Sequence, residues 1–559
     1  MPTGRAHSDP APTTDEVAIV AAATATLRNR RPLRNARLKE AANAFHAGRM
    51  DEAEHLLSKY LEQRVGDASA LFLLAETALK LGRKERALDL LARCVAAEPG
   101  YEAARLVYAN TLYQLNRLEE ALAELEHLLG ADPHNILYLD LKAAALGASA
   151  RHRDAMLCRR QIVTRHANAP ELWVKYGKAL SGIGEREEGA DAFRRAIALN
   201  PSCGSAWWAL ADLKTWRFSD AEIAAMESAL ARAGANDRMY LHFALGSAHG
   251  DTKAYAKSFD HIARANAMKR PTIRYDADWL SAQVASCKRL FTREFLERHA
   301  CSGAVSTAPI FVVGLQRAGS TLVEQILGSH SSIEAAGELP DITLLVENLA
   351  GTAGLNGGPP YPDAVAMLDD GSLRQFGENY LKTTRVRRPL NRPFFVDKNP
   401  YNFLHLGLIR LILPGARIVD VRRHPLACCW SNFSAHYESG ALFAYRLGEL
   451  GRAYADYVEL MAHYDSVLPG RIIRVIYEDL VADPDAEIRR LLAQLELPFE
   501  PACLTFHTNA RAMNSVSAEQ VRKPIFRESI DRWRNYEPWL APLKSALGPA
   551  IDNWRGNQQ

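Results

Sequence analysis

The sequence lacks the features of several protein classes. Its eight cysteines form no Cys-x-x-Cys pair, so neither a zinc site nor a secreted disulfide framework is indicated. No run of 18 uninterrupted apolar residues occurs, and we therefore expect no membrane span. The formal net charge is only +3 over 559 residues. Such a small charge argues against a nucleic-acid partner but leaves room for a local basic pocket.

The beginning of the chain also lacks the pattern of a secretory signal. A signal starts with basic residues, whereas this segment is polar and carries two acidic residues just before its first apolar run. That run, residues 17–27, is rich in alanine and threonine and is too weakly apolar for a signal core. We therefore expect a cytoplasmic protein in which residues 1–34 form a tail or a lead-in helix.

The bulk composition is that of a globular protein with more than one domain. Apolar residues make up 48% of the chain and charged residues 24%, an ordinary balance. A chain of 559 residues is too long for one hydrophobic core and predicts two or three domains.

The first half of the chain carries a repeat with a step of 34 residues. Three columns of small or turn-forming residues keep this step through five units: Gly48, Gly82, Asn116, Ala150 and Gly184; Ala53, Ala87, Ala121, Ala155 and Gly189; and Ala41, Ala75, Ala109, Ala143 and Gly177. Small residues let two paired helices approach closely, and glycine or asparagine forms the left-handed turn between them at low cost. The spacing thus predicts stacked helix pairs.

The motif Trp173-x-x-Tyr176-Gly177 stands where tetratricopeptide repeats carry Trp-x-x-Leu-Gly. Residues 35–202 therefore resemble that family over about five repeats. Residues 203–304 keep a helical pattern without the strict step, and we expect degenerate helical repeats that cap the array. The resemblance implies that the array binds a protein or mediates self-association.

The pattern changes at residues 309–327, which read as strand, glycine loop and helix. Pro309–Gly314 is a β-branched and aromatic run typical of a buried parallel strand. The loop Gly314-Leu-Gln-Arg-Ala-Gly-Ser-Thr321 follows, and such a loop directs backbone N–H groups and a helix N-terminus toward one anion. Nucleoside triphosphatases have a lysine where this loop has Ser320, so triphosphate chemistry is disfavoured. Arg317 supplies a fixed charge instead.

A second strand, turn and helix follow at residues 414–433. Arg423 ends the strand, His424-Pro425 makes the turn, and Ser431 lies eight residues after Arg423. An arginine fork suits a dianionic phosphate. Four further motifs complete the set: Gly337-Glu338, Val396-Asp-Lys398-Asn-Pro400, Tyr477-Glu-Asp-Leu480 and Ser517-Ala-Glu-Gln-Val-Arg522-Lys523-Pro524.

In this order the motifs resemble those of sulfotransferases, particularly protein-tyrosine sulfotransferases, over about residues 305–545. The resemblance implies a fold of class α plus α/β, in which a tetratricopeptide-type helical solenoid precedes a P-loop-like parallel-sheet sulfotransferase domain at residues 305–559. It also implies 3′-phosphoadenosine 5′-phosphosulfate as co-substrate, no metal ion, and transfer of a sulfuryl group to a hydroxyl.

The resemblance assigns a role to each candidate residue. The residues implied to bind the donor are Gly314, Arg317, Ala318, Gly319, Ser320, Thr321, Arg423, Ser431, Tyr477, Arg522 and Lys523, with Arg423 and Ser431 on its 3′-phosphate. Glu338 is the implied catalytic base, and Arg317, Lys398 and Ser517 would neutralise developing charge. His424 replaces the family's usual aspartate, so we expect a change in how the turn is braced.

The acceptor stays open between a protein tyrosine, a sugar and a small phenol. Tyrosine sulfotransferases that prefer acidic peptides carry an arginine after Gly-Glu, where this chain has Leu339-Pro-Asp341. Two other functions compete with sulfuryl transfer. A P-loop phosphotransferase or triphosphatase would need the missing lysine and a metal-holding carboxylate, for which Asp420 is the candidate. A catalytically inert repeat scaffold would bind a partner only.

Overall fold

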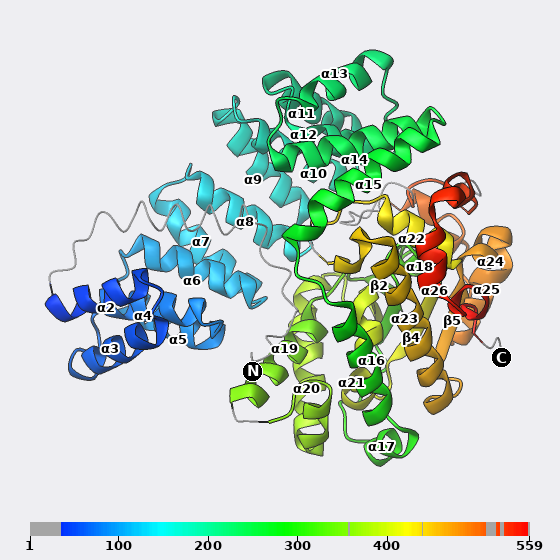
Figure 1. The fold of residues 1–559 in the computed structure, drawn as a ribbon. Helices are drawn as coiled ribbons and strands as arrows, with labels where there is room; N and C mark the ends of the chain where they lie inside the picture. Colours follow the sequence, from blue (N-terminus) through cyan, green and yellow to red (C-terminus); the bar gives the residue numbers. More distant parts are fainter. Residues whose placement is uncertain (1–34, 356–357, 439, 510–520, 526–529, 557–559) are drawn as a thin grey trace. The chain divides into compact units, whose positions relative to one another are not determined.

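The computed structural model describes residues 35–355, 358–438, 440–509, 521–525 and 530–556 (Figure 1). The chain divides into two compact units, one with the described residues up to Ala167 and one that begins at Asn168. The tail or lead-in helix expected at residues 1–34 lies outside the described residues.

The described residues of the first unit form four antiparallel helix pairs. The helices are α2 (Ala36–His46), α3 (Met50–Gln63), α4 (Ala68–Lys80), α5 (Lys84–Ala97), α6 (Glu102–Gln114), α7 (Leu118–Ala131), α8 (Ile136–Ala148) and α9 (His152–Arg165) (Figure 1). The turn within each pair passes through a left-handed residue, with φ of +77°, +76°, +60° and +61° at Gly48, Gly82, Asn116 and Ala150. The predicted turn positions and tetratricopeptide-type helix pairs are confirmed.

The second unit starts with a fifth pair of the same kind, α10 (Pro170–Ile183) and α11 (Arg186–Leu199). Gly184 takes the left-handed turn position with φ of +95°. A Cβ atom at Gly177 would lie 2.5 Å from the ring of Phe193 and 3.0 Å from the carbonyl oxygen of Gly189. A residue without a side chain at Gly177 therefore allows the close approach of α10 and α11.

Six helices follow before the sheet: α12 (Gly204–Asp212), α13 (Asp220–Leu230), α14 (Ala235–Asp251), α15 (Tyr255–Lys269), α16 (Ala277–Leu290) and α17 (Arg293–Arg298). Their buried residues, among them Trp208 and Phe243, belong to the same hydrophobic core as Phe311 and Val313 of the sheet. This segment therefore shares a core with the sheet domain, and the domain boundaries drawn from the sequence stay predictions.

The sheet has five parallel strands in the order β2-β3-β1-β4-β5. The strands are β1 (Pro309–Gly314), β2 (Ile333–Ala335), β3 (Phe394–Asp397), β4 (Arg417–Arg422) and β5 (Ile472–Ile476). The helices around it are α18 (Ser320–Leu327), α19 (Asp341–Leu355), α20 (Asp370–Thr383), α21 (Leu406–Ile412), α22 (Pro425–Phe433), α23 (Leu447–Val467), α24 (Tyr477–Ala482), α25 (Pro484–Gln494), α26 (Ala541–Leu547) and α27 (Ala550–Asn553). The parallel sheet predicted for the C-terminal half is confirmed.

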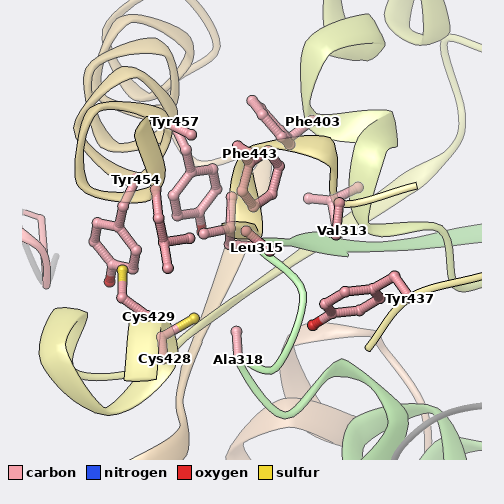
Figure 2. Packing of buried hydrophobic residues seen from close by; sticks show 14 of the residues in the cluster. Val313, Leu315, Ala318, Phe403, Cys428, Cys429, Tyr437, Phe443, Tyr454 and Tyr457 are labelled. Carbon is pink, nitrogen blue, oxygen red and sulfur yellow. The ribbon is translucent and has the colours of Figure 1, made fainter. Parts of the chain in front are cut away.

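Both faces of the sheet are covered, as successive side chains of β1 show. Ile310 and Val312 pack with residues of α18 and α25, whereas Phe311 and Val313 pack with residues of α21, α22 and α23. Figure 2 shows Val313, Leu315 and Ala318 beneath the aromatic side chains of α23 and its neighbours. The start of the glycine loop is therefore anchored in the core. No helix in the described ranges is long and apolar enough to cross a membrane.

A glycine contact between α20 and α21 gives a test of this packing. A Cβ atom at Gly377 would lie 2.1 Å from the carbonyl oxygen of Ile412, a backbone atom that also accepts a hydrogen bond from Ala304 N at 2.9 Å. Gly377→Ala should therefore lower the free energy of unfolding by about 1–3 kcal/mol, the usual cost of overpacking a core.

The measurement is urea unfolding followed by tryptophan fluorescence, because all nine tryptophans lie in the second unit. Gly448→Ala in α23 is the matched control, since nothing lies within 4 Å of its Cβ position. Equal unfolding midpoints for the two variants would contradict the close contact at Gly377.

Candidate functional site

The candidate residues gather at the carboxyl edge of the sheet, where parallel strands place ligand sites. Each of the five strands contributes to this edge. The loop of residues 314–321 follows β1, and Glu338, Lys398, Arg423 and Tyr477 follow β2, β3, β4 and β5, respectively.

The loop after β1 depends on two glycines. Gly314 has φ of +144°, and a Cβ atom there would lie 2.4 Å from the carbonyl oxygen of Val421. Gly319 has φ of +106°, and its Cβ position lies 2.6 Å from the ring of Tyr477. Gly319 also caps α18, because its carbonyl oxygen accepts from Leu322 N at 2.9 Å. The loop thus leads directly into the N-terminus of α18, an arrangement that favours an anion.

The second cluster meets this loop. Arg317 Nε donates to Ser431 Oγ at 3.0 Å, and Arg423 Nη1 donates to the carbonyl oxygen of Arg317 at 3.3 Å. The guanidinium carbon of Arg423 also lies 4.8 Å from the centre of the Tyr477 ring. The loop and the strand-end arginine, which are more than 100 residues apart in sequence, therefore lie side by side.

One pocket is lined by residues from both clusters. Among the residues expected from the sequence, the lining contains Arg317, Gly319, Ser320, Thr321, Arg423, Ser431, Tyr477 and Lys523. Gly314 and Ala318 are buried beneath it, and Ala318 is one of the side chains in the core shown in Figure 2. These two residues shape the loop.

The lining also contains residues that sequence reasoning missed. Lys214, Ser247, Ser258 and Ile262 come from the helical segment, Trp430 and Ser434 from α22 and the residues after it, and Arg532, Trp533 and Tyr536 from a region near the C-terminus. A lysine in a turn is usually exposed, so no local signal marked Lys214. The aromatic run beside Arg532 could have indicated a nucleotide-facing segment, because aromatic rings and arginine recur at such sites.

The pocket is positively charged. Five cations line it, namely Lys214, Arg317, Arg423, Lys523 and Arg532, and its described lining holds no carboxylate. Burial lowers the pKa of Lys214. The charges of Arg317 and Arg532 lower this pKa as well, whereas Asp212 raises it. So dense a positive charge attracts a polyanion.

His424 lies in the turn after β4 and is held there by two contacts. Its ring stacks on Trp533, with the ring centres 5.2 Å apart and the planes 8° from parallel. Its backbone N–H donates to Glu478 Oε1 at 3.0 Å. Burial lowers the pKa of His424, which favours the neutral ring. Stacking on Trp533 and the hydrogen bond to Glu478 thus hold this turn in place.

Glu338 and Lys398 form an ion pair beside the pocket. The side chain of Lys398 is 2% exposed and that of Glu338 52% exposed, so the lysine is fixed and the carboxylate faces solvent. Neither residue belongs to the pocket lining. Tyr401 is near both places, since Gln316 of the loop and the charge of Glu338 both act on the pKa of its hydroxyl, which burial raises.

The segment that contains Ser517, Arg522 and Lys523 is only partly described. Ser517 lies outside the described residues. Arg522 Nη2 donates to the carbonyl oxygen of Gly182 at 3.4 Å, and its guanidinium lies against Gly184. Arg522 is therefore placed at the end of α10 and not in the pocket lining, whereas Lys523 lines the pocket. The binding roles of both residues stay predictions.

Asp420, the carboxylate that a metal-dependent phosphotransferase would use, has other partners. It is completely buried, and its Oδ2 lies 2.9 Å from Arg422 Nε and 3.1 Å from Arg474 Nη2. Burial alone would raise its pKa, but the two guanidinium groups hold the pKa of Asp420 below its usual value. These contacts make it a structural residue of β4.

A buried carboxyl group lies next to Lys398. Asp397 is completely buried and accepts a hydrogen bond from the hydroxyl of Tyr380, with Oδ2 at 2.8 Å. Burial raises the pKa of Asp397 to about 8. The end of β3 thus carries a carboxyl group that keeps its proton at neutral pH.

Comparisons with known proteins agree with both halves of this architecture. The profile of the sulfotransferase family matches residues 309–501, and that of the tetratricopeptide repeat matches residues 170–213. A third profile, that of subunit 3 of the anaphase-promoting complex, or cyclosome, matches residues 46–128.

Individual relatives match parts of the chain. An uncharacterized protein of Aquifex aeolicus is 32% identical over 375 residues, which are 66% of this chain and 49% of that protein, so the chain spans about half the length of this relative. A putative protein-tyrosine sulfotransferase of Caenorhabditis briggsae is 25% identical over 238 residues, 40% of this chain and 80% of its own. Among solved structures, MamA of Desulfovibrio magneticus covers 30% of this chain and 98% of its own, with 17% identity and a TM-score of 0.29.

The buried carboxyl group of Asp397 predicts a pH dependence. Its folded pKa of about 8 lies above its unfolded value, so the unfolded state releases this proton first as the pH rises. The contribution of Asp397 to stability is therefore complete below about pH 4 and is lost between about pH 4 and pH 8.

Asp397→Asn should remove this loss, because an amide keeps the acceptor for Tyr380 and does not ionise. The midpoint of thermal unfolding should rise relative to the unchanged protein at pH 8 more than at pH 5. Asp485→Asn, on an exposed carboxylate paired with Arg489, is the control and should shift neither midpoint. A drop at pH 8 for Asp397→Asn would mean that the group is ionised in the folded state.

Proposed function

Because residues 309–501 form a sulfotransferase-family domain behind tetratricopeptide-type repeats, we propose that this chain transfers a sulfuryl group from 3′-phosphoadenosine 5′-phosphosulfate to an acceptor hydroxyl. One observation carries the proposal: the loop after β1 and the pair Arg423 and Ser431 line the same pocket. The contact of 3.0 Å between Arg317 and Ser431 joins the two clusters directly.

The co-substrate carries an anionic group at each end of its adenosine, and the pocket offers hydrogen-bond donors for both groups. The N–H groups at the start of α18, with Ser320 and Thr321, fit the 5′-phosphosulfate. Arg423 and Ser431 fit the 3′-phosphate, to which an arginine can donate two hydrogen bonds. Gly319 keeps the backbone close enough to Tyr477 for the nucleotide to contact both. The residues present therefore suit this donor.

In the reaction, the bond between sulfur and the bridging oxygen of the 5′-phosphate breaks as a bond forms between sulfur and the acceptor oxygen. The acceptor proton passes to Glu338, and the leaving group is adenosine 3′,5′-bisphosphate. The main tasks of the protein are alignment and charge stabilisation, as in phosphoryl transfer. Lys398 is held rigidly enough to stabilise charge on the transferring group, since it is buried and its backbone N–H donates to Gly337 at 3.0 Å.

The acceptor side lies where Glu338 reaches solvent. A phenol has a pKa near 10 and needs a base at neutral pH, which favours an acceptor such as tyrosine. The printed name of the Caenorhabditis relative supports the same class. Asp341 just beyond Glu338 is buried against Arg387, with 3.3 Å between Oδ2 and Nη1, so this arginine is already engaged by a carboxylate. A neutral tyrosine-containing peptide is therefore the acceptor that we propose.

Calorimetry with adenosine 3′,5′-bisphosphate and with ATP tests the donor site. The unchanged protein should bind the bisphosphate more tightly than ATP. Arg423→Ala should weaken binding of the bisphosphate by about 10- to 100-fold, the effect of losing hydrogen bonds between charged groups. Arg264→Ala is the control, because this exposed arginine of α15 pairs only with Asp260 among the described residues. Tighter binding of ATP, with turnover that requires magnesium, would favour a phosphotransferase.

Transfer of radiolabelled sulfate to a tyrosine peptide, a sugar and a phenol tests the chemistry. Glu338→Gln should lower turnover by about 10²- to 10⁴-fold, the usual contribution of a general base, and leave the affinity for the bisphosphate unchanged. Glu378→Gln, on an exposed face of α20, should leave both unchanged. Full turnover of Glu338→Gln would remove this residue from the mechanism. Nucleotide binding without product from any acceptor would identify an inert scaffold.

A further inference from the structure

The helical segment before the sheet supplies one wall of the pocket. Lys214 follows α12, Ser247 lies on α14, and Ser258 lies on α15. This wall is fixed to the sheet domain, since Ser258 Oγ donates to the carbonyl oxygen of Gly246 at 2.6 Å and lies 3.0 Å from the hydroxyl of Tyr536. The wall is therefore positioned before any ligand arrives.

Lys214 is the charged residue of this wall. Its ammonium group lies 3.1 Å from Asp212 Oδ1 and 5.2 Å from the centre of the Trp208 ring. The side chain is 29% exposed. An aromatic face on one side and the pocket on the other thus hold the ammonium group at the opening that Arg317 and Ser431 also line.

Positive charges gather at this corner of the pocket. Lys214 is close enough to Arg317 and Arg532 for both charges to act on it. Within the described part of the chain, Arg532 forms no ion pair with a carboxylate, and Asp212 is the acid that lies against Lys214. Like charges gathered in a partly buried pocket are unfavourable until a bound anion compensates them. The preceding helices thus contribute to ligand binding as well as to packing.

We propose that Lys214 is a donor-binding residue that contacts the 3′-phosphate held at Ser431, so that the helical segment forms part of the donor site. This inference rests on the proposed function, because it assumes the same donor. It adds a third source of phosphate contacts, from a segment outside the sheet domain. The donor site is then complete only when α12–α15 pack on the sheet.

The experiment uses variants of the whole chain. Lys214→Met removes the charge but keeps an apolar stem against Trp208, and Lys214→Arg restores the charge. Lys253→Ala is the matched control, because Lys253 also has a left-handed backbone, with φ of +61° against +59° for Lys214, and does not line the pocket. The ligands are adenosine 3′,5′-bisphosphate and adenosine 5′-monophosphate, measured by calorimetry.

Lys214→Met should weaken binding of the bisphosphate by about 10-fold or more and binding of the monophosphate by less than about threefold, because only the bisphosphate carries the 3′-phosphate. Lys214→Arg should recover most of the affinity, and Lys253→Ala should bind like the unchanged protein. The thermal midpoint of each variant checks that it is folded.

The outcomes separate this inference from the proposed function. If the unchanged protein binds the bisphosphate well and Lys214→Met binds it equally well, Lys214 is not a donor-binding residue and the proposed function stands. Equal losses for both nucleotides would place Lys214 away from the 3′-phosphate and overturn the inference. If the unchanged protein fails to bind the bisphosphate, the proposed function itself fails.

Discussion

The close approach of the loop after β1 to its neighbours is the constraint on which the site depends. Gly314 lies against the backbone of β4 and Gly319 against the ring of Tyr477, in both cases at distances that leave no room for a side chain. The two glycines also have positive φ angles, which other residues adopt at a cost. Because the loop runs so close to β4 and β5, the residues that follow these strands can meet the start of α18. Three segments distant in sequence thus form one anion-binding surface.

Charge is distributed in two opposite ways around this loop. Among the strands, Asp420 pairs with Arg422 and Arg474, and Asp465 pairs with Arg474 as well, so two carboxylates balance two guanidinium groups. Within the pocket, cations from several segments face a common space with no carboxylate among the described lining residues. The carboxylates beside the strands are therefore paired with arginines, whereas the positive charge of the pocket faces the space where a ligand would enter. This separation is typical of sites that bind multiply charged anions.

Local patterns were sufficient to predict the repeat helix pairs and the strands β1 and β4. The repeat turns were predicted because left-handed positions favour glycine and asparagine, and β1 and β4 because their apolar runs are bounded by turn residues. Asn116 and Ala150 adopt the predicted left-handed conformation although only glycine does so freely, since the repeat geometry imposes it. The loop and its partners Arg423 and Ser431 were predicted from short motifs, each of which spans only a few residues of the sequence.

The remaining lining residues could not be predicted in this way. Lys214 and Arg532 reach the pocket through packing between segments hundreds of residues apart, and nothing in their immediate neighbours encodes that packing. The sequence suggested that the helices before the sheet end an array, because their periodicity is that of any amphipathic helix. Their shared core with the sheet comes from tertiary contacts such as that between Ser258 and Tyr536. Position in space, and not residue type, distinguishes these side chains.

The stacked aromatic rings between α15 and the sheet domain have a consequence for dissecting the protein. Phe259 stacks on Trp430 at 6.2 Å and on Trp539 at 5.4 Å between ring centres. A fragment that started at the first strand would lack Phe259 and expose one face of each indole ring, and exposed aromatic surface of this kind promotes aggregation. A fragment that keeps this packing should therefore retain the chain from Asn168 onward, where the second compact unit begins.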